Sequence, residues 1–248
     1  MANQPIWILG GYQSDFARNL TREERGFDSL TAEIVGETLA SAEMGAGDID
    51  TVHVANAFGQ LFTGQGHLGA MPATVADGLW GLPAARHEAA CASGSVALLT
   101  AMAELEAGRY ETALVVGAEL ERTVPGDMAA QHLGAASWVG HEGNPTYVWP
   151  DAFSQLADEY DRRYGLAEAH LRAFAEMAFR NARTNPKAQT RGWRFGDNSF
   201  SADDDVNPVV AGRMRRTDCS QVTDAGAGVV LVTEAWLRAN HGDGLPDH

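Results

Sequence analysis

Four short apolar runs stand out along the chain, at residues 6–9, 52–55, 113–116 and 229–232. Each run ends at a glycine, asparagine or threonine, and this length and punctuation predict buried β-strands. The runs at 113–116 and 229–232 are continuous rather than alternating. That pattern is typical of parallel strands covered on both faces. The chain is therefore expected to contain a mainly parallel sheet.

Helical periodicity fills the segments between these strands. One pattern begins near Asp28 or Ser29, which are possible caps, and a second spans residues 92–107 and is followed by Gly108. Strands that alternate with helices indicate βαβ units and an α/β fold with helices on both faces of the sheet. The apolar positions expected to face the core are Leu30, Ile34 and Leu39 in the first helix, and Val96, Leu99 and Ala103 in the second.

A stretch of about a hundred residues, 120–218, interrupts this alternation. It contains two amphipathic helical patterns followed by a polar loop from Thr184 to Thr217. A connection of this length is too long to be a plain loop, so we expect an inserted α-helical subdomain. The apolar stripes of its helices comprise Phe153, Leu156, Ala157, Tyr160 and Tyr164 in one, and Leu171, Phe174, Ala175 and Ala178 in the other.

Composition narrows the class of protein. The 248 residues include 18 Lys and Arg against 33 Asp and Glu, which gives a net charge of −15. Such an acidic chain is a poor general binder of nucleic acid or anionic membranes. Two cysteines make no disulfide framework, and no apolar window approaches the length of a membrane span. With no secretion signal at the N-terminus, we expect a soluble cytoplasmic protein.

The segment around Cys91 carries the clearest chemical signal. An extended stretch leads into Cys91, and Ala92, Ser93 and Gly94 then open the helix at 92–107. Unpaired amides and the positive end of a helix favour a thiolate, and the same amides can stabilise an oxyanion. Cys91 is therefore a candidate nucleophile; the alternative is a buried structural cysteine.

The eight histidines suggest no metal site. None belongs to an H-x-x-x-H motif or a Cys/His cluster with ligand spacing, so we expect no bound metal. His87 precedes Cys91 by four residues on the incoming extended segment. We expect an ordinary packed or surface role for it.

Several segments together resemble the thiolase family. Glu88-Ala-Ala-Cys-Ala-Ser-Gly-Ser and the following Ala107-Gly-Arg-Tyr-Glu-Thr-Ala-Leu-Val-Val-Gly-Ala-Glu119 resemble the nucleophile strand, helix and next strand of thiolases. Thr223-Asp-Ala-Gly-Ala-Gly-Val-Val-Leu-Val232 resembles the strand that closes their N-terminal half. Phe153-Ser-Gln-Leu-Ala-Asp-Glu-Tyr160 is similar to the loop domain of sterol-carrier-protein-type thiolases. Glu88 departs from the pattern, since many thiolases have asparagine there.

The resemblance implies a domain plan. Residues 1–240 correspond to a thiolase N-terminal domain, a thiolase-like half-fold with its loop subdomain at 120–218. Residues 241–248 form a tail leading to a C-terminal half that this chain lacks. The family's Gly-His-Pro and Cys-x-Gly motifs, which supply a histidine and a second cysteine, do not occur here. We therefore expect a fragment or an incomplete enzyme.

The resemblance also implies a reaction. Cys91 would accept an acyl group from an acyl-CoA, as in a thiolase or acetyl-CoA acetyltransferase, with CoA as a substrate and no other cofactor. Ser220 would contact the pantetheine arm of CoA. Cys219 occupies no position that the family uses for chemistry, so its role would be structural. Because CoA is a polyanion, local arginines are candidates for its phosphates. The candidates in the loop subdomain are Arg191, Arg194, Arg213, Arg215 and Arg216.

Two other functions and one assembly state follow from the same resemblance. A thiolase-like aldolase acts on a CoA ester with a partner subunit and needs no cysteine nucleophile. A non-catalytic thiolase-like binding subunit would explain the missing C-terminal motifs. The extended segment from Ala84 to Ala90 would otherwise leave an unpaired sheet edge, so we expect a homodimer or higher homo-oligomer built on that edge.

Overall fold

The computed structural model describes residues 5–141 and 146–242, which form two compact units. The first unit contains the chain up to Ser14, Leu20–Leu120 and the chain from Asp224 onward. The second contains Asp15–Asn19 and Glu121–Thr223. Of the predicted tail at 241–248, His241 ends the last helix, and residues 243–248 lie outside the described part of the chain.

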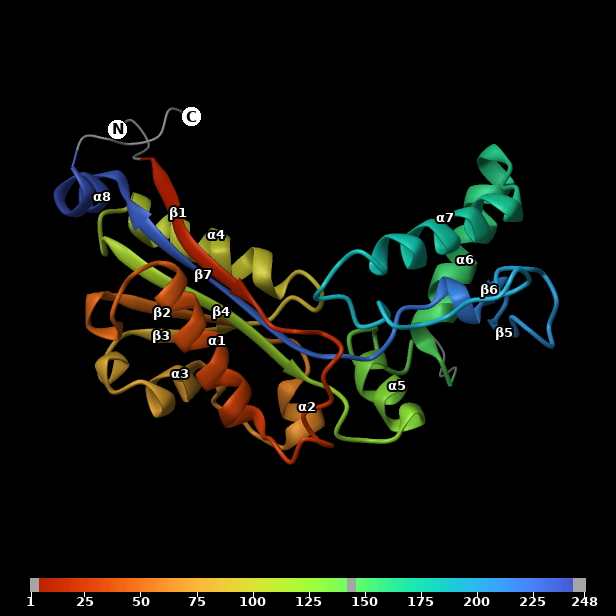
Figure 1. The fold of residues 1–248 in the computed structure, drawn as a ribbon, viewed down its shortest axis with the longest axis horizontal. Coiled ribbons are helices and arrows are strands. Elements are labelled where there is room, and N and C mark those ends of the chain that lie inside the picture. Colours follow the sequence, from red (N-terminus) through yellow and green to blue (C-terminus); the bar gives the residue numbers. More distant parts are fainter. Residues whose placement is uncertain (1–4, 142–145, 243–248) are drawn as a thin grey trace. The chain divides into compact units, whose positions relative to one another are not determined.

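The first unit is built on a five-stranded sheet (Figure 1). Its strands are β1 (Ile6–Gln13), β2 (Thr51–Ala55), β3 (Ala84–His87), β4 (Thr112–Leu120) and β7 (Asp224–Thr233), in the order β1-β7-β4-β2-β3. β4 pairs with β2 and β2 with β3 in parallel, whereas β7 runs antiparallel to both β1 and β4. Four strands thus share one direction, which confirms the α/β fold with a mainly parallel sheet.

The expectation that residues 229–232 form a parallel strand was wrong. The continuous apolar run of β7 reflects burial on both faces, because this strand lies between β1 and β4 inside the sheet. Burial produces the same sequence pattern in either strand direction. The run therefore located the strand correctly but carried no information about its direction.

Helices cover both faces of this sheet (Figure 1). α1 (Phe27–Ser41) and α3 (Met71–Val75) pack on one face, and α4 (Ser93–Glu106) packs on the other. Alternate residues of β4 separate the two cores, since Leu114 belongs to the cluster under α1 and Val115 to the cluster under α4. The unit also contains α2 (Gly59–Thr63), α8 (Glu234–His241) and the 3₁₀ turns Ala46–Asp48, Leu68–Ala70 and Asp77–Leu79.

The face that α4 turns toward the sheet differs from the predicted one. Its buried apolar residues are Ala97, Ala101 and Leu105, whereas Leu99 is 63% exposed and Val96 also lies on the surface. Alanines allow the helix to lie close to the sheet, so the smaller apolar stripe is the one that packs. Val96 and Leu99 therefore face away from the sheet.

Two glycines of β7 let α1 pack closely on the face of the sheet opposite α4. A Cβ atom at Gly226 would lie 1.8 Å from Cδ1 of Ile34, and one at Gly228 would lie 2.4 Å from Oγ1 of Thr38. Both distances are far shorter than any van der Waals contact. The Gly-x-Gly spacing in this strand therefore serves helix–sheet packing.

The second unit contains three helices and a small hairpin. They are α5 (Gly126–Gly134), α6 (Val148–Tyr164), α7 (Glu168–Ala182), β5 (Val209–Ala211) and β6 (Met214–Arg215), with a 3₁₀ turn at Arg216–Asp218. α6 contacts the hairpin through polar groups: the Arg213 amide donates to Oγ of buried Ser154, and the guanidinium bridges Asp158 and Asp161. The predicted stripe on α6 is largely exposed, at Phe153, Leu156, Tyr160 and Tyr164.

Candidate active site

Cys91 lies in the turn between β3 and α4 and is exposed. α4 begins at Ser93 with Ala92 as its N-cap, so the thiol stands immediately before the helix. Ala90 has a φ of 49°, the left-handed region that residues with a Cβ rarely adopt. The chain thus makes a sharp, strained bend directly before the cysteine.

Local hydrogen bonds hold this bend. Oγ of Ser93 accepts from the Ala89 amide at 3.0 Å and donates to the Ala90 carbonyl at 2.6 Å. The Glu88 carboxylate accepts from the Ala90 amide at 2.6 Å. The Ala92 and Ser93 amides already donate to the Ala89 and Ala90 carbonyls, so the donors left at the start of the helix are the amides that follow, those of Gly94 and Ser95. The arrangement suits an exposed nucleophile with hydrogen-bond donors at hand.

Three polar residues meet on the face of the sheet that α4 covers. Nδ1 of His53 lies 2.9 Å from Nε2 of His87, and Nε2 of His53 lies 3.3 Å from a carboxylate oxygen of Glu104. Burial lowers the pKa of His53, and the nearby imidazole of His87 acts in the same direction; the carboxylate of Glu104 opposes this shift. His87 therefore takes part in a specific cluster that joins β2, β3 and α4.

A second polar cluster lies at the carboxyl ends of β2, β3 and β4. The Glu119 carboxylate accepts from the amides of Ala57 at 2.5 Å and Phe58 at 3.4 Å. The Arg86 guanidinium donates to the carbonyls of Asn56 at 3.0 Å and Ala57 at 2.8 Å. Burial raises the pKa of Glu119, although these two amides and the charge of Arg86 oppose the shift.

Neither cluster was predicted from the sequence. The residues that contact one another in these clusters lie 29 to 62 positions apart in the sequence, and only the alignment of the strands brings them together. A polar residue inside an apolar strand was the available signal, as with His53 in Val52-His53-Val54. A buried polar side chain in such a position usually requires a partner.

The other predicted site residues belong to the second unit. Ser220 is exposed, in the segment between the 3₁₀ turn and β7. Cys219 is partly buried, its thiol lies 3.4 Å from the Arg215 carbonyl, and burial raises its pKa. These features agree with the structural role expected for Cys219.

Four of the five candidate arginines have protein partners. Arg191 pairs with Asp15, Arg213 with two aspartates of α6, Arg215 with Asp204, and Arg216 donates to the Val206 carbonyl. Arg194 is exposed. An arginine already paired with a carboxylate is less available to a phosphate. Arg194 is therefore the best placed of the five to meet an anion.

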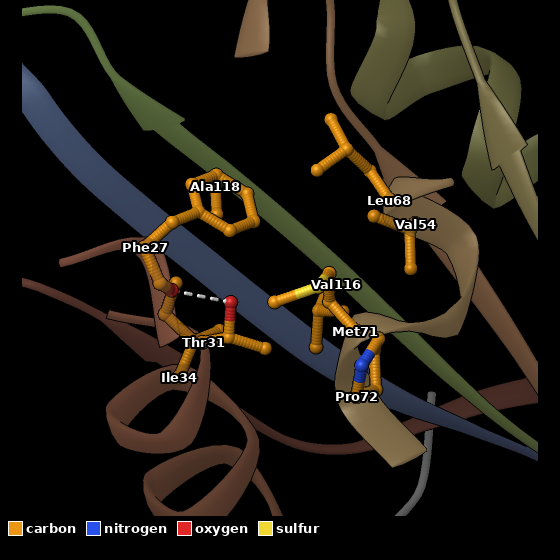
Figure 2. A pocket seen from close by; sticks show the side chains of 9 residues that line it. All are labelled: Phe27, Thr31, Ile34, Val54, Leu68, Met71, Pro72, Val116 and Ala118. Atoms are coloured by element: carbon orange, nitrogen blue, oxygen red, sulfur yellow. Dashed lines mark hydrogen bonds between the residues drawn. The ribbon is translucent and has the colours of Figure 1, made fainter. Parts of the chain in front are cut away.

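The described ranges contain few features of any other kind of site. No group of three or more His, Cys, Asp and Glu residues there could hold a metal ion. In the same residues no helix is long and apolar enough to cross a membrane. A pocket between α1, α3 and the sheet, shown in Figure 2, is lined by apolar side chains and Thr31, whose hydroxyl donates to the Phe27 carbonyl. It offers no nucleophile or acid–base group.

Comparison with known proteins identifies the family. Residues 6–235 match the model of the thiolase N-terminal domain, so the chain belongs to the thiolase family. An acetyl-CoA acetyltransferase of Methanocaldococcus jannaschii is 32% identical over 232 residues, covering 93% of this chain and 56% of that protein. The chain thus spans about half the length of such curated relatives.

Solved structures show the same fold. The Acat5 thiolase of Ascaris suum, solved in complex with coenzyme A, has a TM-score of 0.69 at 14% identity and covers 94% of this chain and 67% of its own. An aldolase, Ltp2-ChsH2(DUF35), has a TM-score of 0.68 at 20% identity and covers 94% of this chain and 56% of its own. At these identities the likeness concerns the fold alone.

Proposed function

We propose that Cys91 accepts an acyl group from an acyl-CoA, as in a thiolase-type C-acyltransferase. The observation that supports this most is the place of Cys91: exposed, after a strained bend, and one residue before the N-cap of α4. The name of the Methanocaldococcus relative, acetyl-CoA acetyltransferase, points to acetyl-CoA as the first substrate to test.

The proposed step conserves atoms and charge. The Cys91 thiolate attacks the thioester carbonyl, the tetrahedral oxyanion collapses, and CoA leaves as a thiolate that takes up a proton. The amides at the start of α4 would stabilise the oxyanion. The acyl-cysteine then passes its acyl group to CoA or to a second, carbanionic acyl-CoA. In the second unit, Ser220 is the proposed contact for the pantetheine arm, as the family resemblance implies, and exposed Arg194 is the proposed contact for a phosphate of CoA.

We further propose that a second thiolase half completes the site. The outer face of α4 leaves Val96 and Leu99 exposed, and Ile8 on β1 is 68% exposed. Large apolar side chains on a helix and the neighbouring sheet edge are typical of a surface that another domain covers. The additional half would bring the histidine of the Gly-His-Pro motif and the cysteine of the Cys-x-Gly motif, neither of which occurs in this sequence.

A homodimer through β3 belongs to the same proposal. β3 is an edge strand that pairs with β2 alone, and Ala84 and Ala85 are exposed on it. Small side chains would allow the same strand of a second copy to pair with it. A cytoplasmic location remains a prediction from the composition.

The principal alternative is an aldolase acting on a CoA ester with a partner subunit. The observation that favours it is the structural likeness to the Ltp2-ChsH2(DUF35) aldolase. A non-catalytic binding subunit is the third possibility. The retained Ala-Cys-Ala-Ser-Gly sequence at the helix start favours acyl transfer over both, because neither requires an exposed thiol.

Alkylation by iodoacetamide separates these functions. A nucleophile at Cys91 is expected to react faster than Cys219 and to be protected by acetyl-CoA. The Cys91→Ser variant should lose the fast, protectable phase, and Cys219→Ser should keep it. Slow alkylation of Cys91 that acetyl-CoA leaves unchanged would contradict the acyltransferase and favour one of the other two functions.

A further inference from the structure

Arg86 and Glu119 bind the two ends of the same pair of peptide groups. In the Asn56–Ala57 peptide, the carbonyl accepts from Nε of Arg86 and the amide donates to Oε1 of Glu119. In the Ala57–Phe58 peptide, the carbonyl accepts from Nη2 of Arg86 and the amide donates to Oε2 of Glu119. A cation and an anion are thus joined through two polarised peptide planes rather than directly.

We infer that Arg86 and Glu119 are positioning residues for Cys91, holding the end of β3 from which the cysteine turn begins. This inference rests on the proposed function, because it assigns the pair a purpose in presenting the nucleophile. Neither side chain is assigned contact with substrate. Their action passes through the segment 56–58, which we call the clamped segment.

The clamped segment connects directly to the chain that leads into Cys91. The Asn56 amide donates to the His87 carbonyl at 3.2 Å, so this segment extends the β2–β3 ladder to the last residue of β3. The Asn56 side chain, which is 1% exposed, donates to the Ala118 carbonyl of β4 at 2.6 Å. The end of β3 is therefore tied, through one segment, to the interior of the sheet.

β3 depends on these additional hydrogen bonds more than the other strands do. It has four residues and, among the described strands of its own chain, pairs with β2 alone, so few ladder hydrogen bonds within the chain hold it. The bend after it contains the strained Ala90, and a strained conformation persists only where its surroundings fix it. We call the four hydrogen bonds that Arg86 and Glu119 make to segment 56–58 the clamp. Without them, the bend could relax by a movement of the end of β3, and the Cys91 thiol would move with it.

The charges of Arg86 and Glu119 make the hydrogen bonds of this clamp stronger than neutral ones would be. Each peptide plane donates to a carboxylate and accepts from a guanidinium, and charged partners give stronger hydrogen bonds that polarise one another. A planar guanidinium with several donors can reach both carbonyls, whereas a lysine ammonium is a point charge. The two residues should therefore act as a unit.

The test compares Arg86→Lys, Arg86→Met, Glu119→Gln and the double variant Arg86→Met/Glu119→Gln. Exposed Glu111→Gln and Arg109→Lys serve as matched controls, and circular dichroism identifies variants that remain folded. The first readout is amide hydrogen exchange at Ala57 and Phe58. Removing charge-assisted hydrogen bonds should speed it by about tenfold in Arg86→Met and Glu119→Gln. Arg86→Lys should recover part of the loss.

The second readout is the alkylation rate of Cys91 by iodoacetamide measured across pH, which a merely structural role would not move. We expect the pH profile of the Cys91 rate to shift in Arg86→Met and Glu119→Gln, with Arg86→Lys between these and wild type. The double variant should shift little further, because either loss disables the unit. The profile for Cys219 and those of the two controls should match wild type.

Two outcomes would overturn the inference. Exchange at Ala57 and Phe58 that equals wild type in the folded variants would mean that the contacts do not hold the segment. Faster exchange with an unchanged Cys91 profile would mean that the clamp is structural only. Failure of the proposed function would be a separate result. It would appear in the wild-type chain, because acetyl-CoA would not protect Cys91 from alkylation, and it would not depend on how the variants behave.

Discussion

His53 and His87 place their imidazole rings 5.0 Å apart, nearly parallel, with Nδ1 of one 2.9 Å from Nε2 of the other. One proton arrangement fits the contact between the two rings. If Nε2 of His53 carries the proton facing Glu104, its Nδ1 must accept, and Nε2 of His87 must donate. His53 is then neutral, in agreement with its pKa, which burial lowers.

Acidification should destabilise the chain through His53. Its pKa is lowered in the folded state, chiefly by burial, so the unfolded chain binds more protons below the ordinary value of about 6.5. The contribution to stability is present above that value and is lost as pH falls toward the folded pKa. Urea unfolding at several pH values should show this loss, and His53→Gln should flatten it.

Glu119 should give the opposite pH dependence. Burial raises its pKa in the folded state, so the folded chain binds more protons than the unfolded chain just above the ordinary glutamate value. Its contribution to stability is therefore greatest at low pH and declines as pH rises through the folded pKa. The stability difference between Glu119→Gln and wild type should therefore shift in favour of the variant as pH rises through that window, even if the weakened hydrogen bonds to Ala57 and Phe58 make the variant the less stable of the two at every pH. A difference in free energy of unfolding that does not change with pH would contradict this assignment.

Glycine substitutions test how closely α1 approaches β7. Gly226→Ala places a Cβ atom against Ile34 and should cost at least about 1–3 kcal/mol of stability, as overpacked cores do. Gly36→Ala, also on α1, is the matched control, because a Cβ atom at Gly36 would have no neighbouring atom within 4 Å. It should instead stabilise the chain by about 0.5–1 kcal/mol. Equal effects of the two changes in thermal unfolding would refute the packing described.

Two leucines of α4 test which face of the helix packs. Leu105 is fully buried, so Leu105→Ala should cost about 2–5 kcal/mol. Leu99→Ala, on the exposed face, should change the stability of the chain by less than about 0.5 kcal/mol. A large cost at Leu99 in denaturant unfolding would mean that another surface covers this face in solution, as a dimer or a second half would.

Local patterns predicted much of the fold. Strand positions, the start of α4 near residue 92 and the place of Cys91 before it all followed from apolar runs, caps and small residues. The direction of β7 did not, because burial on both faces gives one pattern for either direction. The packed face of α4 was also misjudged, since the prediction favoured large apolar side chains where closeness to the sheet selected Ala97 and Ala101.

The polar clusters lay beyond sequence reasoning for a different reason. His53 and His87 meet only because β2 and β3 pair with Ala55 opposite His87, and no local signal sets that register. Arg86 and Glu119 meet only through the backbone of the clamped segment, whose amides and carbonyls have no sequence signature. Contacts of this kind depend on tertiary structure, and one sequence alone does not reveal them.

The most direct measurement of the central claim is peptide-level mass spectrometry after incubation with acetyl-CoA. Wild type and Cys219→Ser should carry an acetyl group on the peptide that contains Cys91, and hydroxylamine should remove it as it does a thioester. Cys91→Ser should remain unmodified there. An absence of acetyl on the wild-type Cys91 peptide, or equal acetylation of Cys91→Ser, would contradict Cys91 as the acyl acceptor.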